Sequence, residues 1–186
     1  MIIKRLFMTL VKKKALILDR DGVVNFDTGH VHKIEDFKFV DKIFELCRYY
    51  QESGYIIFIV TNQAGIAKGY YSEKDFITLN DWMLREFEKQ EIYIKDVLFC
   101  PHHPTEGIER YKKICLCRKP SPQMILDIQN KYQISLKKSV LVGDKLSDIE
   151  AGYRAGVGEL VLLKSKYQDE YDFFDLKHYL KTKEKD

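Results

Sequence analysis

Two aspartates separated by one residue, Asp19 and Asp21, follow a short apolar run and could carry phosphoryl chemistry. In an extended chain, side chains at i and i+2 point the same way, with Cα atoms roughly 6–7 Å apart. That gap accommodates a phosphoryl group between a nucleophilic carboxylate and a proton donor. Taken alone, Asp-Arg-Asp-Gly is equally typical of a turn after a strand, because Asp and Gly favour turns.

A second acidic group, Gly143-Asp144-Lys145-x-x-Asp148, follows another apolar run late in the chain. Carboxylates brought together from distant parts of a sequence are the ligands that Mg²⁺ selects, and water and substrate phosphate fill its remaining positions. The two acidic groups together predict a magnesium site rather than two unrelated turns.

Partners for a phosphate come from two further places. Thr61-Asn62-Gln63 follows a third apolar run and offers hydroxyl, amide and backbone N–H donors. Arg118 and Lys119 lie just ahead of a predicted helix N-terminus, where a phosphate is already favoured. Alone, the two cations would be a solvated surface pair; with the carboxylates, they predict an electrostatic clamp for phosphoryl transfer.

Cysteine and histidine gather in one segment, residues 100–117. Three of the four cysteines lie there, and three thiolates with one imidazole suit a closed, tetrahedral, structural zinc site. Ordinary buried thiols are the alternative, and His103 could replace His102 as the imidazole ligand. The remaining cysteine, Cys47, falls on the apolar face of a predicted helix and is expected in the core. The predicted zinc ligands are Cys100, His102, Cys115 and Cys117.

Apolar runs alternate with helical patterns along the chain. The runs predict strands over residues 15–18, 55–60, 97–99, 139–142 and 159–163. Helical spacing predicts helices over 43–53, 72–87, 122–132 and 147–155, and Gly54 is expected to end the first of them. Ser72 with Asp75 is expected to cap the second helix, and Ser121 followed by Pro122 the third.

This alternation predicts an α/β fold: a single Rossmann-like three-layer domain over 1–186, with a mainly parallel sheet and a core at 15–163. Ligands of such sheets bind beyond the carboxyl ends of the strands, and the polar groups above all follow predicted strands. No insertion is long enough for a separate cap domain. We therefore expect an open site, shielded only by the 22–40 segment and the zinc loop.

Composition narrows the class of protein. The 186 residues are 45% hydrophobic and 32% charged, which excludes a disordered chain. The formal net charge is only +3, so we expect no nucleic-acid partner. No long apolar stretch predicts a membrane span, and no export signal is evident, so we expect a cytoplasmic protein. Met8 could be the true start, and the tail after Lys164 is expected to hold one surface helix.

The four polar groups, taken together, resemble the four motifs of the haloacid dehalogenase (HAD) superfamily of phosphatases. The resemblance implies that Asp19 is the nucleophile, forming an aspartyl phosphate, and that Asp21 is the general acid and base. It also implies Mg²⁺ bound by Asp19, the main-chain carbonyl of Asp21 and Asp144, with Asp148 as a ligand or close neighbour. Thr61 and Lys119 would neutralise phosphoryl charge.

Within the superfamily, Cys-Pro-His-His and Cys-x-Cys-Arg-Lys-Pro resemble the zinc loops of heptose-bisphosphate 7-phosphatases and histidinol phosphatases. The long zinc loop, the 27–32 segment and the 61–69 segment favour the heptose group. That resemblance implies a small phosphosugar substrate, and we expect a monomer. Alternatives are a histidinol or nucleic-acid 3′-phosphatase, or a zinc-stabilised binding module without catalysis. The implied substrate contacts are Asp27, Thr28, Gly29, His30, Thr61, Asn62, Gln63, Ala64, Arg118, Lys119 and Lys145.

Overall fold

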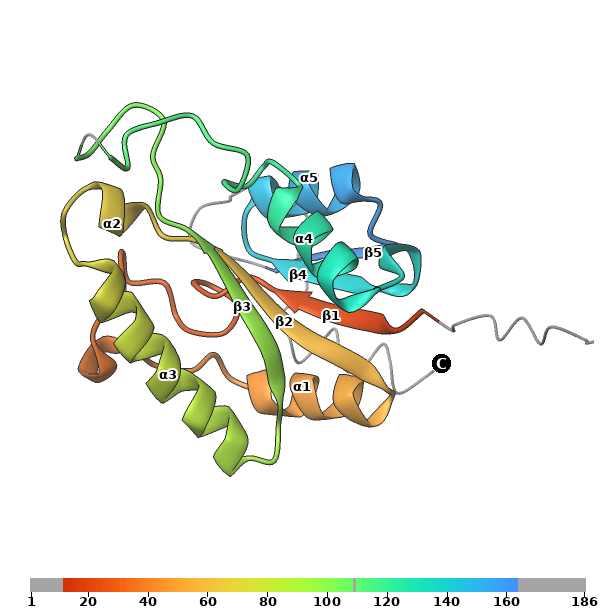
Figure 1. Ribbon diagram of the computed structural model, residues 1–186. Helices are drawn as coiled ribbons and strands as arrows, with labels where there is room; N and C mark the ends of the chain where they lie inside the picture. Colours follow the sequence, from red (N-terminus) through yellow and green to blue (C-terminus); the bar gives the residue numbers. More distant parts are fainter. Residues whose placement is uncertain (1–11, 109, 164–186) are drawn as a thin grey trace, which may run out of the picture.

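The computed structural model describes residues 12–108 and 110–163. Five parallel strands form one sheet in the order β3-β2-β1-β4-β5 (Figure 1). The α/β class and the mainly parallel sheet are confirmed, whereas the choice between Met1 and Met8 and the tail helix lie outside the described residues. The strands are β1 (Lys14–Leu18), β2 (Tyr55–Asn62), β3 (Ile94–Cys100), β4 (Val140–Gly143) and β5 (Glu159–Leu162).

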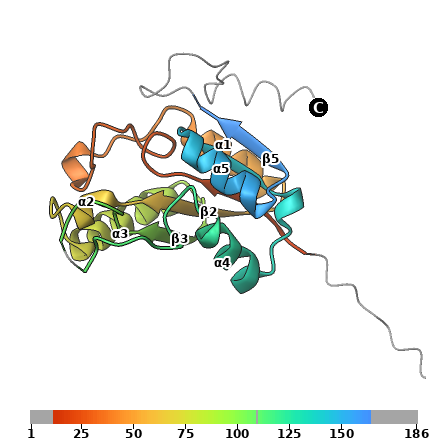
Figure 2. The same cartoon turned by 90° about the horizontal axis from the view of Figure 1, so that it is seen from above.

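The central strand β1 is buried on both faces because its side chains alternate between two apolar cores. Leu16 and Leu18 join the core on one face of the sheet, whereas Ala15 and Ile17 join the core on the other. A continuous apolar run is what a strand between two covered faces requires. The layers can be followed from above in Figure 2, where β3 and β5 lie at opposite edges of the sheet.

Helices cover both faces, as Figure 1 shows. On one face lie α1 (Ile43–Glu52), whose buried residues include Cys47 as predicted, and α3 (Glu73–Lys89). On the other lie α4 (Gln123–Tyr132) and α5 (Leu146–Ala155). The short elements are α2 (Ala64–Ala67) and two 3₁₀ turns, η1 (Ile34–Asp36) and η2 (Leu136–Lys138).

Most predicted helix ends are confirmed, but one is wrong. Ser72 and Asp75 form the expected capping box at the start of α3, and Gly54 follows the end of α1 with a positive φ of 78°. Ser121 does not cap α4: its backbone N–H donates to Arg118 O at 2.8 Å, so it belongs to the preceding turn. Pro122 takes the cap position, where no side chain caps the helix.

Two long connections extend from the carboxyl edge of the sheet. Residues 19–42 join β1 to α1, and residues 101–122 join β3 to α4, mostly without helix or strand. No separate cap domain is present in the part of the chain that the structure describes. Among the same residues, no helix is long and apolar enough to cross a membrane.

Candidate active site

A cavity of about 470 Å³ opens at the carboxyl ends of the strands. It lies where parallel α/β sheets bind ligands, because the connections after neighbouring strands diverge there. Tyr71, Pro120 and Ser147 also line it, although their residue types gave no reason to single them out. The predicted site residues that line it are Asp19, Asp21, Asp27, Gly29, His30, Thr61, Asn62, Gln63, Ala64, Arg118, Lys119, Lys145 and Asp148.

Three carboxylates, those of Asp19, Asp144 and Asp148, meet beside this cavity. One oxygen of each lies within 4.8 Å of the others, and all three residues are buried. They converge because β1 and β4 are adjacent and parallel, so Asp19 and Asp144 leave the sheet at the same edge. An all-oxygen donor set of this kind fits Mg²⁺.

The electrostatics of this cluster also favour a cation. Burial raises the pKa of Asp19 to about 6, against the opposing effect of Lys119. Burial, reinforced by the neighbouring Asp19, raises the pKa of Asp144 to about 8. Both shifts mean that the protein alone stabilises the negative charge incompletely, and a bound divalent cation would supply the missing compensation.

Lys119 supplies part of that positive charge from within the core. Its Nζ lies 2.6 Å from Asp19 Oδ1 and 2.7 Å from Asp148 Oδ1, and it donates to Val60 O at 2.8 Å. Burial alone would lower the pKa of Lys119, but Asp148 and Asp19 raise it above its usual value. Lys119 is therefore a buried ammonium fixed beside Asp19, not a surface cation.

Asn62 holds the Lys119 backbone in place. Its Nδ2 donates to Lys119 O at 3.0 Å, and its Oδ1 accepts from Lys119 N–H at 3.0 Å. The resemblance implied a substrate contact for Asn62, which lines the cavity, and its side-chain amide also holds the Lys119 backbone. Fifty-seven residues separate the pair, so no local pattern could show this contact.

The carboxylate of Asp21 is held from three directions. Arg20 Nη2 donates to Oδ1 at 2.8 Å and to Oδ2 at 3.0 Å; Asn25 Nδ2 donates to Oδ1 at 3.1 Å. Gln63 Nε2 donates to Oδ2 at 2.9 Å. Arg20 is only 1% exposed, with its guanidinium 5.5 Å from the Phe76 ring. Sequence reasoning missed Arg20, although a cation between two aspartates was the available signal.

Apart from Thr61, Asn62 and Gln63, which line the cavity, the predicted substrate contacts divide into three groups. Gly29, His30 and Ala64 line the cavity, and His30 makes an edge contact with the exposed Tyr70 ring at 4.9 Å. Thr28 is exposed and is not among the lining residues. The charged members line the cavity and also bind other residues of the protein. Lys145 Nζ forms an ion pair with Asp27 Oδ2 at 3.2 Å, and Arg118 Nη1 donates a hydrogen bond to His102 O at 3.1 Å.

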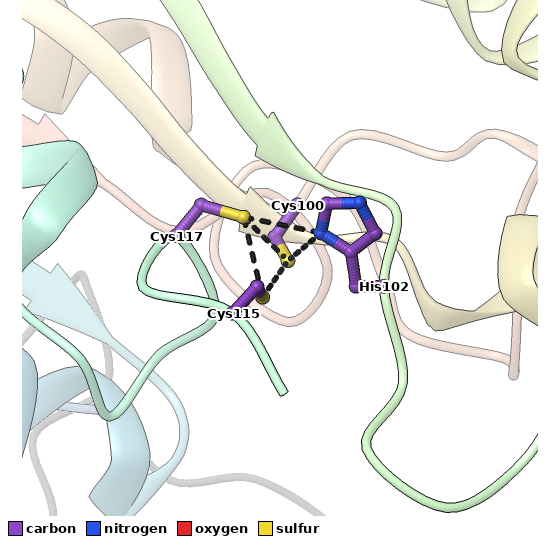
Figure 3. Close-up of side chains that lie close together, drawn as sticks. All are labelled: Cys100, His102, Cys115 and Cys117. Carbon is purple, nitrogen blue, oxygen red and sulfur yellow. Dashed lines mark hydrogen bonds between the residues drawn. The ribbon is translucent and has the colours of Figure 1, made fainter. Parts of the chain in front are cut away.

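The predicted zinc ligands form a second cluster beyond β3 (Figure 3). Sulfur–sulfur distances run from 3.0 Å between Cys117 and Cys100 to 3.4 Å, and His102 Nδ1 lies 3.4 Å from Cys117 Sγ and 3.7 Å from Cys100 Sγ. Edges of about 3.5–3.8 Å are expected around a tetrahedral metal with bonds of about 2.0–2.3 Å. The sulfur atoms lie closer together than these edges, whereas the two His102 distances are near them. The set Cys100, His102, Cys115 and Cys117 therefore has the composition of a closed metal site, and its ligand atoms are gathered around one point.

His103 has a different environment from His102. Its Nδ1 accepts from the backbone N–H of Glu106 at 3.0 Å, so the ring closes a turn of the loop. The structure thus brings His102, not His103, to the three thiols. The reason is local: alternate residues of the extended segment after β3 point to opposite sides.

The cysteine–histidine loop itself is not a wall of the cavity, contrary to expectation. None of the described loop residues, 100–108 and 110–117, lines it, whereas Arg118, Lys119 and Pro120, directly after the loop, do. The loop instead packs on α2 and the start of α3. Ile108 N–H donates to Ala67 O at 2.8 Å, and Tyr111 Oη donates to Glu73 Oε1 at 2.7 Å. Its influence on the site therefore passes through Arg118 and Lys119.

Comparison with known sequences points to one family. A family model described as HAD-hydrolase-like matches residues 116–176. D-glycero-alpha-D-manno-heptose-1,7-bisphosphate 7-phosphatases from Campylobacter jejuni and Burkholderia mallei are 49% and 52% identical to this chain, covering 88% and 82% of it and 90% and 81% of their own lengths. A D-glycero-beta-D-manno-heptose-1,7-bisphosphate 7-phosphatase from Vibrio cholerae is 44% identical, covering 82% of each chain.

The fold agrees with these sequences. The crystal structure of D,D-heptose 1,7-bisphosphate phosphatase from B. bronchiseptica, complexed with magnesium and phosphate, is similar with a TM-score of 0.71 and 30% identity. The match covers 81% of this chain and 80% of that one. These relatives and this structure show that the chain belongs to the heptose-1,7-bisphosphate 7-phosphatase family of HAD-like hydrolases.

Proposed function

We propose that the protein is a Mg²⁺-dependent phosphatase that removes the 7-phosphate of D-glycero-D-manno-heptose 1,7-bisphosphate. The observation that carries the proposal is the position of Asp19 in the cavity, beside Lys119 and next to the acidic cluster. A nucleophile held by a buried cation next to a divalent-metal site suits attack on a phosphate monoester. The high identity to phosphatases of that name supports the choice of substrate.

The reaction proceeds in two displacements. Asp19 attacks phosphorus, and the bond between phosphorus and the sugar oxygen breaks as Asp21 transfers a proton to that oxygen. Asp21, now a carboxylate, takes a proton from water as the water attacks the aspartyl phosphate. The products are the heptose 1-phosphate and inorganic phosphate. Lys119 and the Thr61 hydroxyl stabilise the phosphoryl oxygens in both steps.

Two metals complete the proposal. Asp19, Asp144 and the main-chain carbonyl of Asp21 would hold Mg²⁺, with Asp148 adjacent; bound there, it supplies positive charge for the phosphoryl oxygens. Cys100, His102, Cys115 and Cys117 would hold Zn²⁺, whose four protein ligands leave no open position for catalysis. We therefore assign the zinc a structural role.

We further propose the alpha anomer as the preferred substrate, since the relatives with that name reach 49% and 52% identity, against 44% for the beta-anomer relative. The product would enter the synthesis of nucleotide-activated heptose for bacterial surface polysaccharide. We also predict that the protein is a monomer, that it lies in the cytoplasm and that it acts without a nucleic-acid partner.

The test is release of inorganic phosphate in the presence of Mg²⁺ from both anomers of the heptose bisphosphate and from histidinol phosphate. We expect kcat/KM for the alpha anomer to exceed that for the beta anomer by about tenfold and that for histidinol phosphate by more. Asp19→Asn, which keeps the side-chain shape, is the control and should abolish turnover. Faster hydrolysis of histidinol phosphate would overturn the assignment.

A further inference from the structure

One glutamine joins three functional side chains at the base of the cavity. Gln63 Nε2 donates to Asp21 Oδ2 at 2.9 Å and to Thr61 Oγ1 at 2.8 Å. Gln63 Oε1 accepts from Tyr71 Oη at 2.5 Å. Gln63 is only 1% exposed, so water does not compete for these bonds. Both amide hydrogens and the carbonyl thus have assigned partners, which leaves the amide one orientation.

This orientation sets the hydrogen bonding of both reactive groups. Because Thr61 Oγ1 already accepts from Gln63, its single hydroxyl hydrogen remains available for a phosphoryl oxygen. The carboxylate of Asp21 accepts from Arg20 at both oxygens, from Asn25 at Oδ1 and from Gln63 at Oδ2. The plane of the Asp21 carboxylate therefore depends on the balance between the bonds from Arg20 and Asn25 and the bond from Gln63.

Tyr71 is itself rigidly placed. Its ring stacks on His32 with centroids 4.8 Å apart and planes 6° apart. Gly65 lies against the hydroxyl end of the ring, where a Cβ would be only 2.2 Å from a ring carbon. Burial raises the pKa of the Tyr71 hydroxyl, so the hydroxyl stays protonated and can act as the donor to Gln63.

We propose that Tyr71 is a positioning residue for the phosphatase reaction, acting on the general acid Asp21 through Gln63. Its hydroxyl fixes the carbonyl end of the Gln63 amide, so that the amino end faces Asp21 Oδ2 and holds the acid toward the leaving oxygen. Without that hydroxyl, the buried carbonyl of Gln63 loses its partner and the amide shifts. Asp21 then follows Arg20 and Asn25 away from the leaving oxygen. The inference rests on the proposed function, because it assigns Asp21 the acid role.

The test separates loss of the acid from general damage by changing the leaving group. An alkyl phosphate such as the heptose bisphosphate needs a proton on its leaving oxygen, whereas p-nitrophenyl phosphate releases a stable phenolate. We expect Tyr71→Phe to lower kcat/KM for the alkyl phosphate about tenfold and that for p-nitrophenyl phosphate less than about twofold. Because kcat/KM covers only the steps up to leaving-group departure, slow hydrolysis of the aspartyl phosphate does not enter it. An equal loss with both substrates, or no loss, overturns the proposal.

A matched control comes from the same apolar cluster. Tyr111 packs with Tyr71 in one group of buried residues and also loses a single hydroxyl hydrogen bond, to Glu73, when changed to Phe. Tyr111→Phe should leave the ratio of the two kcat/KM values unchanged. A similar change of ratio in this variant would show that any hydroxyl lost from the cluster suffices, and would also overturn the proposal.

The route through Gln63 is tested by a double-mutant cycle. In a Gln63→Met background the Tyr71 hydroxyl has no amide to orient, so adding Tyr71→Phe should lower kcat/KM for the alkyl phosphate less than about twofold further. A further tenfold loss would contradict the route. The unmodified protein is assayed alongside: if it fails on heptose bisphosphate, the proposed substrate is wrong, and the ratios are then measured with an alkyl phosphate that it does hydrolyse.

Discussion

Lys119 Nζ lies 2.6 Å from Asp19 Oδ1, although 100 residues separate the two along the chain. Lys119 also lies 2.7 Å from Asp148 Oδ1, so one ammonium bridges two of the three clustered carboxylates. Lys145 Nζ lies 4.0 Å from Asp144 Oδ1 but also 3.2 Å from Asp27 Oδ2, so Lys145 and Asp27 cancel in the charge count. With all groups ionised, the three carboxylates and Lys119 then leave a charge of −3 + 1 = −2. One divalent cation would balance this remaining negative charge, so the carboxylates still need Mg²⁺ after Lys119 has paired with two of them.

The negative charge that Lys119 leaves uncompensated predicts how the free energy of unfolding depends on pH in the absence of Mg²⁺. The folded-state pKa values of Asp19 and Asp144, about 6 and about 8, lie above the ordinary value of 3.8. Between pH 4 and 8 the folded state therefore holds protons that the unfolded state has released, so the free energy of unfolding falls as the pH rises. We expect a fall on the order of 5 kcal/mol between pH 5 and pH 8, measured by urea denaturation.

Saturating Mg²⁺ should remove most of that fall, because it compensates the carboxylates directly. The protein is dialysed into Mg²⁺-free buffer without a chelator, so that the cysteine–histidine site keeps its metal. Asp144→Asn, which lacks the group with the larger shift, should show a smaller fall without Mg²⁺. A stability that stays constant or rises over this range would contradict the prediction.

Gly22 is predicted to leave the space that the Asp144 side chain occupies. It has a φ of 102°, and a Cβ there would lie 2.2 Å from Asp144 Oδ2. Gly54 also has a positive φ, 78°, but nothing lies within 4 Å of an added Cβ. Gly54→Ala should therefore cost only the backbone strain, about 1 kcal/mol, with activity retained. Gly22→Ala should cost more and lower kcat/KM at least about 100-fold, measured by phosphate release and thermal denaturation. Equal losses in the two variants would refute the contact.

Removing one thiol from the cysteine–histidine cluster should weaken both metal binding and catalysis. Cys115→Ser should reduce the bound zinc, measured by elemental analysis, and lower the unfolding temperature, because a structural metal contributes directly to folding. It should also lower kcat, since Arg118 and Lys119 follow the loop directly. Cys47→Ala is the control: Cys47 is a buried core thiol, so its loss should cost about 1 kcal/mol and leave zinc content and kcat unchanged. Undiminished zinc in Cys115→Ser, or no zinc in the unmodified protein, would contradict the assignment.

Much of the fold could be predicted from the sequence because its signals are local. Continuous apolar runs such as 55–60 indicate doubly covered strands, and a serine with an aspartate three residues later predicts the start of α3. It was also predictable that the site residues lie close together, because the carboxyl ends of parallel strands share one edge of the sheet. Asp19 and Asp144 had to come together once β1 and β4 were neighbours.

The directions of individual side chains depend on tertiary contacts. The sequence by itself determined the α/β class, the edge that holds the site and the residue types available for metal and phosphate. Only the tertiary structure decided that Asn62 holds the Lys119 backbone and that Arg20 is buried against Asp21. Asn62 and Lys119 are 57 residues apart, so their hydrogen bonds form only when packing brings both within about 3 Å. Arg20 and Asp21 are adjacent, but the guanidinium is buried only because the fold places it near Phe76.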